Sequence, residues 1–295
     1  SVNLDVIAVA APRADGRVRV KSKGYDMDEV SLDDLDVRDA EKNHSAALVR
    51  GTAARFAQLG YRVGGFDAYT TSDVLKGSGL SSSAAFEVLL GAILNQLYNG
   101  GAVSAVEVAK IAQYAENVYF GKPSGLMDQM ASSVGGIITI DFADTDKPVI
   151  ETVDFDFAAA DHALCIVDTG GNHADLTHEY AAVPAEMRAV AASLGVTYLR
   201  ETSMEALIPA IPALRKAHGD RAVLRAIHFL GDNERVSRQV AALNAGDFDE
   251  FKRLVVESGH SSFEYLQNVY AACDVEFQGL SLALALAQRA LDGCG

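Results

Sequence analysis

The chain has 295 residues, of which 49% are hydrophobic and 22% are charged. This composition excludes a disordered chain, and the length predicts two domains with substantial cores. The formal net charge of −15 argues against a nucleic-acid-binding protein, whose surface should be basic, so an anionic substrate would need a local device such as a metal ion or a helix N-terminus.

The first sixty residues predict two strands and a helix. Residues 2–11 and 17–23 have strand-like patterns, and the turn between them contains Asp15-Gly16, a strong hairpin signal. The acidic stretch 26–39 is interpreted as a solvated surface segment. A helix is predicted over residues 45–59 and is closed by Gly60.

A strand over residues 65–74 then leads into a glycine turn and a strongly periodic helix. Ser82 or Ser83 is the predicted N-cap of that helix. Its apolar positions follow the i, i+3, i+4 spacing, namely Phe86, Leu89, Leu90, Ile93, Leu94 and Leu97.

The second half of the chain is predicted to be increasingly helical, which places a domain boundary near residues 155–162 and gives domains 1–160 and 161–295. The predicted elements are a helix at 104–119, a buried strand at 136–141, a strand at 162–169, a helix at 177–194, mostly helix from 221 onward, and a buried helix at 280–291. Phe155 and Phe157 are expected to be packing residues, and Cys165 an inert core thiol.

The three cysteines have no paired spacing, which indicates a reducing compartment. No signal peptide and no apolar run long enough to cross a membrane is found. We therefore expect a cytoplasmic protein. His173 and His178 lie close together in the sequence, but no cysteine or third histidine stands near them at ligand spacing, so a metal site is not expected there.

Residues 77–85, Gly-Ser-Gly-Leu-Ser-Ser-Ser-Ala-Ala, are the most informative stretch of the chain. Glycines just before a helix let the backbone approach a ligand closely, and the free N–H groups of the first turn favour an anion. The stretch therefore predicts a phosphate-binding loop. The alternative is an ordinary capped helix after a glycine turn.

Two acidic residues downstream could complete such a site. Glu116 lies near the end of the helix 104–119, and a carboxylate beside a serine hydroxyl is the hard oxygen set that Mg²⁺ prefers; the alternative is a solvated surface glutamate. Asp128 lies in the first turns of a short helix after the Pro- and Gly-containing stretch 121–125. It could complement the helix N-terminus or act as a general base.

In their order along the chain, these features resemble the GHMP small-molecule kinases, and most closely the galactokinases. Residues 79–84, Gly-Leu-Ser-Ser-Ser-Ala, are similar to the phosphate motif of that family. Residues 115–117 followed by 125–129 resemble a stretch that distinguishes galactokinases from other members. Further counterparts lie at 167–170 with His173, 179–180, 233–236 and 257–260, so that the resemblance covers nearly the whole chain.

The resemblance implies a two-domain α+β fold, with a ribosomal S5 domain 2-like N-terminal domain, an incomplete ferredoxin-like C-terminal domain and the active site in the cleft between them. It implies ATP and Mg²⁺ as cofactors and a small-molecule sugar as substrate. Ser83 and Glu116 would share Mg²⁺, and Asp128 would accept the proton of the anomeric hydroxyl of galactose as its oxygen attacks the γ-phosphorus of ATP. Gly125, Asp128 and Tyr180 would contact the sugar. The ATP phosphates would be held by the backbone of Gly77, Ser78, Gly79, Leu80, Ser81, Ser82 and Ser83.

The chain also departs from the family pattern. The N-terminal Arg and Glu-His-Thr-Asp signature and the C-terminal glycine-rich motif have no match, and we expect the chain by itself to show little or no turnover. Leu75 replaces the usual proline and is followed by Lys76, while Ser124 stands where many galactokinases have cysteine. A kinase for another sugar and a non-catalytic sensor of sugar and ATP remain alternatives. The oligomeric state is not predicted.

Overall fold

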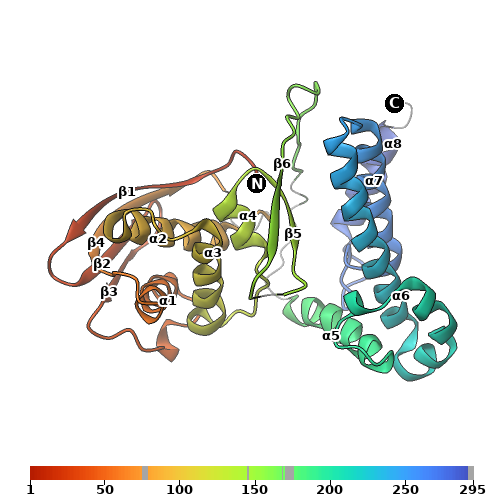
Figure 1. Ribbon diagram of the computed structural model, residues 1–295, viewed down its shortest axis with the longest axis horizontal. Helices are drawn as coiled ribbons and strands as arrows, with labels where there is room; N and C mark the ends of the chain where they lie inside the picture. The colour runs from red at the N-terminus through yellow and green to blue at the C-terminus, as the bar shows by residue number, and fades with distance from the viewer. Residues whose placement is uncertain (75–78, 145, 168, 170–175, 292–295) are drawn as a thin grey trace. The chain divides into compact units, whose positions relative to one another are not determined.

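The structure, a computed structural model, describes residues 1–74, 79–144, 146–167, 169 and 176–291 (Figure 1). The chain divides into two compact units, Ser1–Ile140 and Asp141–Gly295, which are described separately. The division falls inside a strand, whereas the sequence places its domain boundary after residue 160.

The described elements mix strands and helices, in agreement with the predicted α+β class. The strands are β1 (Val6–Arg13), β2 (Arg17–Ser22), β3 (Met27–Ser31), β4 (Gly65–Ser72), β5 (Ile137–Asp141) and β6 (Val149–Val153). The helices are α1 (Ser45–Gln58), α2 (Ser82–Asn99), α3 (Ala105–Tyr114), α4 (Met127–Val134), α5 (Thr177–Ser193), α6 (Met204–Asn244), α7 (Phe248–Ser261) and α8 (Gly279–Leu291). Short helical segments are Asp39–Glu41, Ala115–Phe120, Leu199–Glu201 and Ser262–Leu266.

The first unit contains a four-stranded sheet in the order β1-β4-β2-β3. β4 runs antiparallel to β1 and parallel to β2, and β2 pairs antiparallel with β3. The predicted hairpin between the first two strands is therefore wrong, because β4 lies between them. β4 can approach β2 so closely since it begins with Gly65, where a Cβ atom would lie 2.6 Å from the carbonyl oxygen of Arg17.

The acidic stretch 26–39 is not wholly a solvated segment, because β3 lies within it. Val30 is fully buried while Met27 and Glu29 are exposed, the alternation of a strand with one face on a core. Glu29 lies on the outer face, where it pairs with Arg17 and Arg19, whereas Asp28 is half-buried on the face of Val30.

The core of the first unit lies between one face of this sheet and the helices α1, α2 and α3. Val18, Val20 and Phe66 of the sheet pack in one cluster with Phe56 of α1 and Leu90 of α2. The helices predicted at 45–59 and from 82 onward are confirmed. The predicted helix 104–119 is also confirmed, although its last part, Ala115–Phe120, is π-helical.

The second unit is built mainly of helices. α5 and α6 form its apolar core, and α6 contains a break at Gly219, whose φ is +82°. Phe155 and Phe157 pack against Phe248 of α7, as expected for packing residues. β6 is the strand that lies wholly within the described part of this unit.

Several expectations for apolar stretches are wrong. The described part of 162–169 contains no strand, and no described strand pairs with it. Cys165 is accordingly exposed, as is Val167 at 77%. β5 is half-buried. α8 forms as predicted but has no buried residue, and Leu282 is 62% exposed. Apolar composition predicted burial, but burial also requires a partner surface.

Within the described ranges, no helix is both long enough and apolar enough to span a membrane.

Candidate functional site

The glycine-rich loop meets α2 at Ser81. Leu75, Lys76, Gly77 and Ser78 lie outside the described residues, whereas Gly79 has a φ of +77° and open space where a Cβ would stand. Leu80 follows Gly79 and leads into the helix.

The N-cap of α2 is Ser81, in a left-handed conformation with φ 55° and ψ 55°. Ser82 and Ser83 are the first two residues of the helix, so the predicted N-cap at either of them is wrong. The hydroxyl of Ser81 makes no capping bond and is used elsewhere. First-turn N–H groups have no partner within their own helix, so this end of α2 can receive an anion.

Asp128 faces this loop from the first turn of α4. The Ser81 hydroxyl donates a hydrogen bond to the Asp128 carboxylate, joining residues 47 positions apart. Both side chains line a cavity of about 510 Å³ in the first unit, together with Gly79, Val6 and Ala85. The start of a helix is also where a negative charge is favoured. The structure thus brings the predicted base to the wall of a cavity beside the predicted phosphate loop.

Glu116 contacts the first turn of α2 and is buried, only 2% exposed, which rules out the solvated alternative. Its Oε1 accepts a hydrogen bond from the Ser83 hydroxyl at 3.3 Å and pairs with Lys122 Nζ at 3.1 Å. Its Oε2 accepts a hydrogen bond from Gln129 Nε2 at 2.8 Å. The predicted pair Ser83 and Glu116 is therefore in contact.

Glu87, which the sequence motifs do not include, is a second buried carboxyl group. Its Oε2 accepts a hydrogen bond from the same Gln129 Nε2 at 3.1 Å. Burial, and then the negative charge of Glu116, raise the pKa of Glu87 to about 8. The signal that could have found it is its place in α2, where it is the only charged residue of the helix.

Close packing of α1 places Glu116. A Cβ on Gly51 of α1 would lie 2.8 Å from Tyr119 Cγ and 2.9 Å from Ala115 Cα, so only glycine lets the π-helical segment come this near. The Tyr119 hydroxyl donates to the Leu35 carbonyl at 2.8 Å. Segment Ala115–Phe120 is thus held from both sides, and Glu116 with it.

The two predicted sugar contacts lie on different units. Gly125 precedes α4 and has open space where a Cβ would stand. The neighbouring Ser124 is held by Asn117, whose Oδ1 accepts from the Ser124 backbone N–H at 2.7 Å. Tyr180 stands on α5 of the second unit and is 62% exposed.

The residues around Glu116 suit a magnesium ion. Ser83 and Glu116 offer a hydroxyl and a carboxylate, the hard oxygen ligands that Mg²⁺ prefers. In the described part of the chain, Glu87 Oε1 and Gln129 Oε1 are buried without a hydrogen-bond partner. Buried oxygens in this condition are costly, and a hydrated cation would satisfy them.

The family model for the GHMP kinases N terminal domain matches residues 47–136, which include the Ser81, Glu116 and Asp128 positions. A galactokinase of Streptomyces coelicolor is 35% identical over 87% of this chain. A galactokinase of Mycobacterium tuberculosis is 33% identical over 97% of this chain and 74% of its own length. The chain spans 65% and 63% of the length of the two Streptomyces relatives.

Among solved structures, the galactokinase of Lactococcus lactis, complexed with galactose, matches with a TM-score of 0.74. It is 24% identical, and the match covers 90% of this chain and 68% of that one. This similarity shows the α+β fold of the GHMP kinases. With the sequence identities to its relatives, it leads to one conclusion: the chain belongs to the galactokinase family of the GHMP kinases.

Proposed function

We propose that this chain carries the phosphate-binding loop and the base of an ATP-dependent galactose kinase, which makes galactose 1-phosphate. The observation that carries the proposal is the contact between Ser81 and Asp128 at the wall of the cavity beside the start of α2. It joins a potential proton acceptor to a helix end suited to phosphate.

In the proposed reaction, the anomeric oxygen of the sugar attacks the γ-phosphorus of ATP. A bond forms between that oxygen and phosphorus, the bond from the γ-phosphorus to the bridging oxygen breaks, and ADP leaves with the electron pair. The proton of the anomeric hydroxyl passes to the Asp128 carboxylate. Ser81, which donates to that carboxylate, fixes its orientation. Positioning and charge neutralisation supply most of the catalysis in such transfers.

Ser83 and Glu116 would hold Mg²⁺, with Gln129 and Lys122 fixing the Glu116 carboxylate. When bound, the ion would neutralise charge on the phosphates. The backbone from Gly77 to Ser83 would receive those phosphates. Gly125 and Tyr180 are proposed sugar contacts.

The Asp128→Asn variant of the full-length protein tests the proposal. Asparagine keeps the size and can still accept from Ser81, but it is a far poorer proton acceptor. We expect galactose-dependent ATP consumption to fall at least about a hundredfold, the usual contribution of a general base. Nucleotide binding, followed with a fluorescent ATP analogue, should change little. The matched control is Asp26→Asn, an exposed aspartate before β3, which should keep full turnover.

Three outcomes contradict the proposal. Unchanged turnover in Asp128→Asn removes the assigned base. Absence of turnover in the parent protein, with both galactose and ATP bound, favours a sensor. Faster phosphorylation of another sugar assigns a different substrate within the superfamily.

A further inference from the structure

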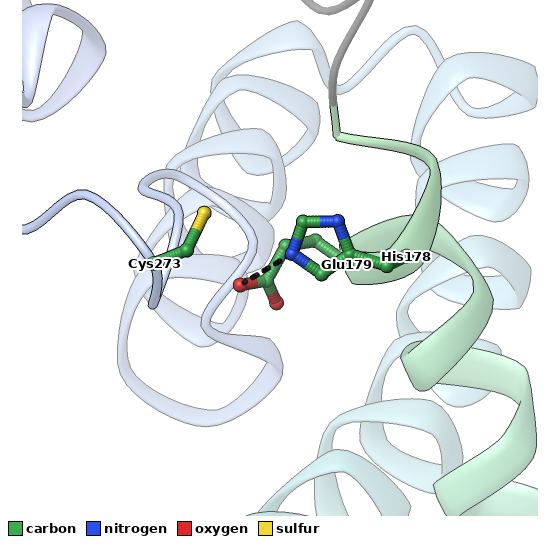
Figure 2. Close-up of side chains that lie close together, drawn as sticks. All are labelled: His178, Glu179 and Cys273. Carbon is green, nitrogen blue, oxygen red and sulfur yellow. Dashed lines mark ion pairs between the residues drawn. The ribbon is translucent and has the colours of Figure 1, made fainter.

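A cluster of three metal-binding side-chain types lies in the second unit, among residues not assigned to phosphoryl transfer. His178 and Glu179 stand in the first turn of α5, and Cys273 stands in the turn at 271–274. Figure 2 shows the thiol, the carboxylate and the imidazole gathered between these two segments. One ligand atom from each residue lies within 4.8 Å of the other two.

A hydrogen bond from the backbone of one segment to a side chain of the other holds the two segments together. Glu179 Oε1 accepts a hydrogen bond from the Ala272 backbone N–H at 3.0 Å, across 93 positions of sequence. The same oxygen lies 3.8 Å from His178 Nε2. The turn that carries Cys273 is closed by a bridge between Ala271 and Asp274. No cysteine stands near His178 in the sequence, but the fold brings Cys273 to it from a distant segment.

The mixture of ligand types indicates which ion would bind. A thiolate disfavours Mg²⁺ and Ca²⁺ and, with imidazole and carboxylate, favours zinc-class transition metals. In tetrahedral zinc sites the ligand atoms lie about 3 to 4 Å apart, given metal–ligand bonds of roughly 2.0–2.3 Å. His178 and Cys273 are exposed, so small side-chain rotations could bring the three atoms to this spacing.

We propose that His178, Glu179 and Cys273 bind one zinc-class divalent ion, with the fourth position open to water or another small ligand. Sites with three protein ligands and one open position are common for this metal. The site uses a different donor chemistry from the oxygen set at Ser83 and Glu116, so excess Mg²⁺ should not compete for it.

Zinc titration of the protein by calorimetry, in excess Mg²⁺, tests the proposal. We expect one Zn²⁺ per chain in the parent and at least about tenfold weaker binding in each of Cys273→Ser, His178→Ala and Glu179→Gln. Even loss of a residue that only orients a ligand typically costs about 10- to 100-fold in metal affinity. Glu179→Gln is informative because its amide oxygen can still accept from Ala272. The matched control is Cys165→Ser, which removes another exposed thiol and should leave affinity unchanged.

Cobalt supplies a second measurement that does not depend on affinity alone. Co²⁺ bound at this site should show a thiolate-to-metal charge-transfer band, which Cys165→Ser retains and Cys273→Ser lacks. Unfolding temperatures in the presence of a chelator should match among parent and variants. The proposal is overturned if the parent takes up no Zn²⁺, if any one of the three variants binds within twofold of the parent, or if the band persists in Cys273→Ser.

Discussion

Glu87 shows how burial changes the behaviour of a single side chain. It lies within hydrogen-bond reach of Gln129, which also binds Glu116, so two carboxyl groups share one amide in a dry environment. Two neighbouring buried carboxylates cannot both ionise cheaply. Without a bound cation, burial and the neighbouring Glu116 raise the pKa of Glu87 to about 8, so that it retains its proton at neutral pH.

The raised pKa predicts a pH-dependent stability that the Glu87→Gln variant should lack. Between about pH 4.5 and pH 8, folded Glu87 keeps a proton that the unfolded chain has lost. Raising the pH through this window therefore lowers the free energy of unfolding, by up to about 1.4 kcal/mol per pH unit, and the loss ends above the folded pKa. Glutamine has no proton to lose, so the variant should gain stability relative to the parent as the pH rises.

Urea unfolding of both proteins at several pH values from 5 to 8, in a chelator, measures that difference. The control is Glu151→Gln, an exposed carboxylate on β6, whose difference from the parent should not follow the pH in this way. A flat difference for Glu87→Gln as well would mean that Glu87 is ionised in the folded protein.

The predicted site residues show what sequence reasoning can and cannot reach. Ser81, Ser83, Glu116 and Asp128 are predicted from the order of family motifs, and the structure puts them in two contacting pairs. The predicted N-cap is wrong because the helix begins one residue earlier, at a left-handed Ser81 whose hydroxyl bonds Asp128, 47 positions away, instead of the helix end. Glu87 lies outside the family motifs, and its raised pKa comes from burial and from Glu116, a neighbour distant in sequence.

At the scale of elements, the contact between α1 and the π-helical segment Ala115–Phe120 leaves no room for a side chain at Gly51. Gly51→Ala would place a methyl group 2.8 Å from Tyr119 Cγ and 2.9 Å from Ala115 Cα. Because backbone must move to relieve this overlap, we expect a loss of about 1–3 kcal/mol in unfolding free energy. Gly259→Ala is the matched control, a glycine of α7 with open space around it, and should add about 1 kcal/mol through helix propensity.

Urea unfolding at one pH compares the two variants. Equal stability of Gly51→Ala and the parent would show that α1 and the Glu116 segment can separate without cost.

Most elements themselves were predictable from periodicity, because helices and strands are local patterns. The pairing of the strands was not predictable from periodicity, because it depends on contacts between distant residues. Phe66 and Ala68 of β4 lie beside Val18 and Val20 of β2 in one core cluster.

For the whole molecule, the net charge of −15 opposes the approach of any anionic ligand. If the chain binds ATP as proposed, the association rate of nucleotide should rise severalfold as salt increases from about 0.01 M to about 0.15 M, because the Debye length falls from about 30 Å to about 8 Å. Stopped-flow binding with a fluorescent ATP analogue measures the rate. Galactose is neutral, so its association should not respond. A nucleotide rate that falls with salt would show that local positive groups outweigh the net charge.

The central place of β4 affects the chain while it is being synthesised. β2 and β3 can pair as soon as residue 31 has left the ribosome, since a short turn joins them. β1 has no partner until residues 65–72 emerge, because its neighbour in the sheet is β4. During that interval, β1 and one edge of β2 present unpaired backbone groups to other nascent chains. The arrival of β4 therefore pairs the inner edges of β1 and β2 and leaves this sheet with only its two outer edges, on β1 and β3.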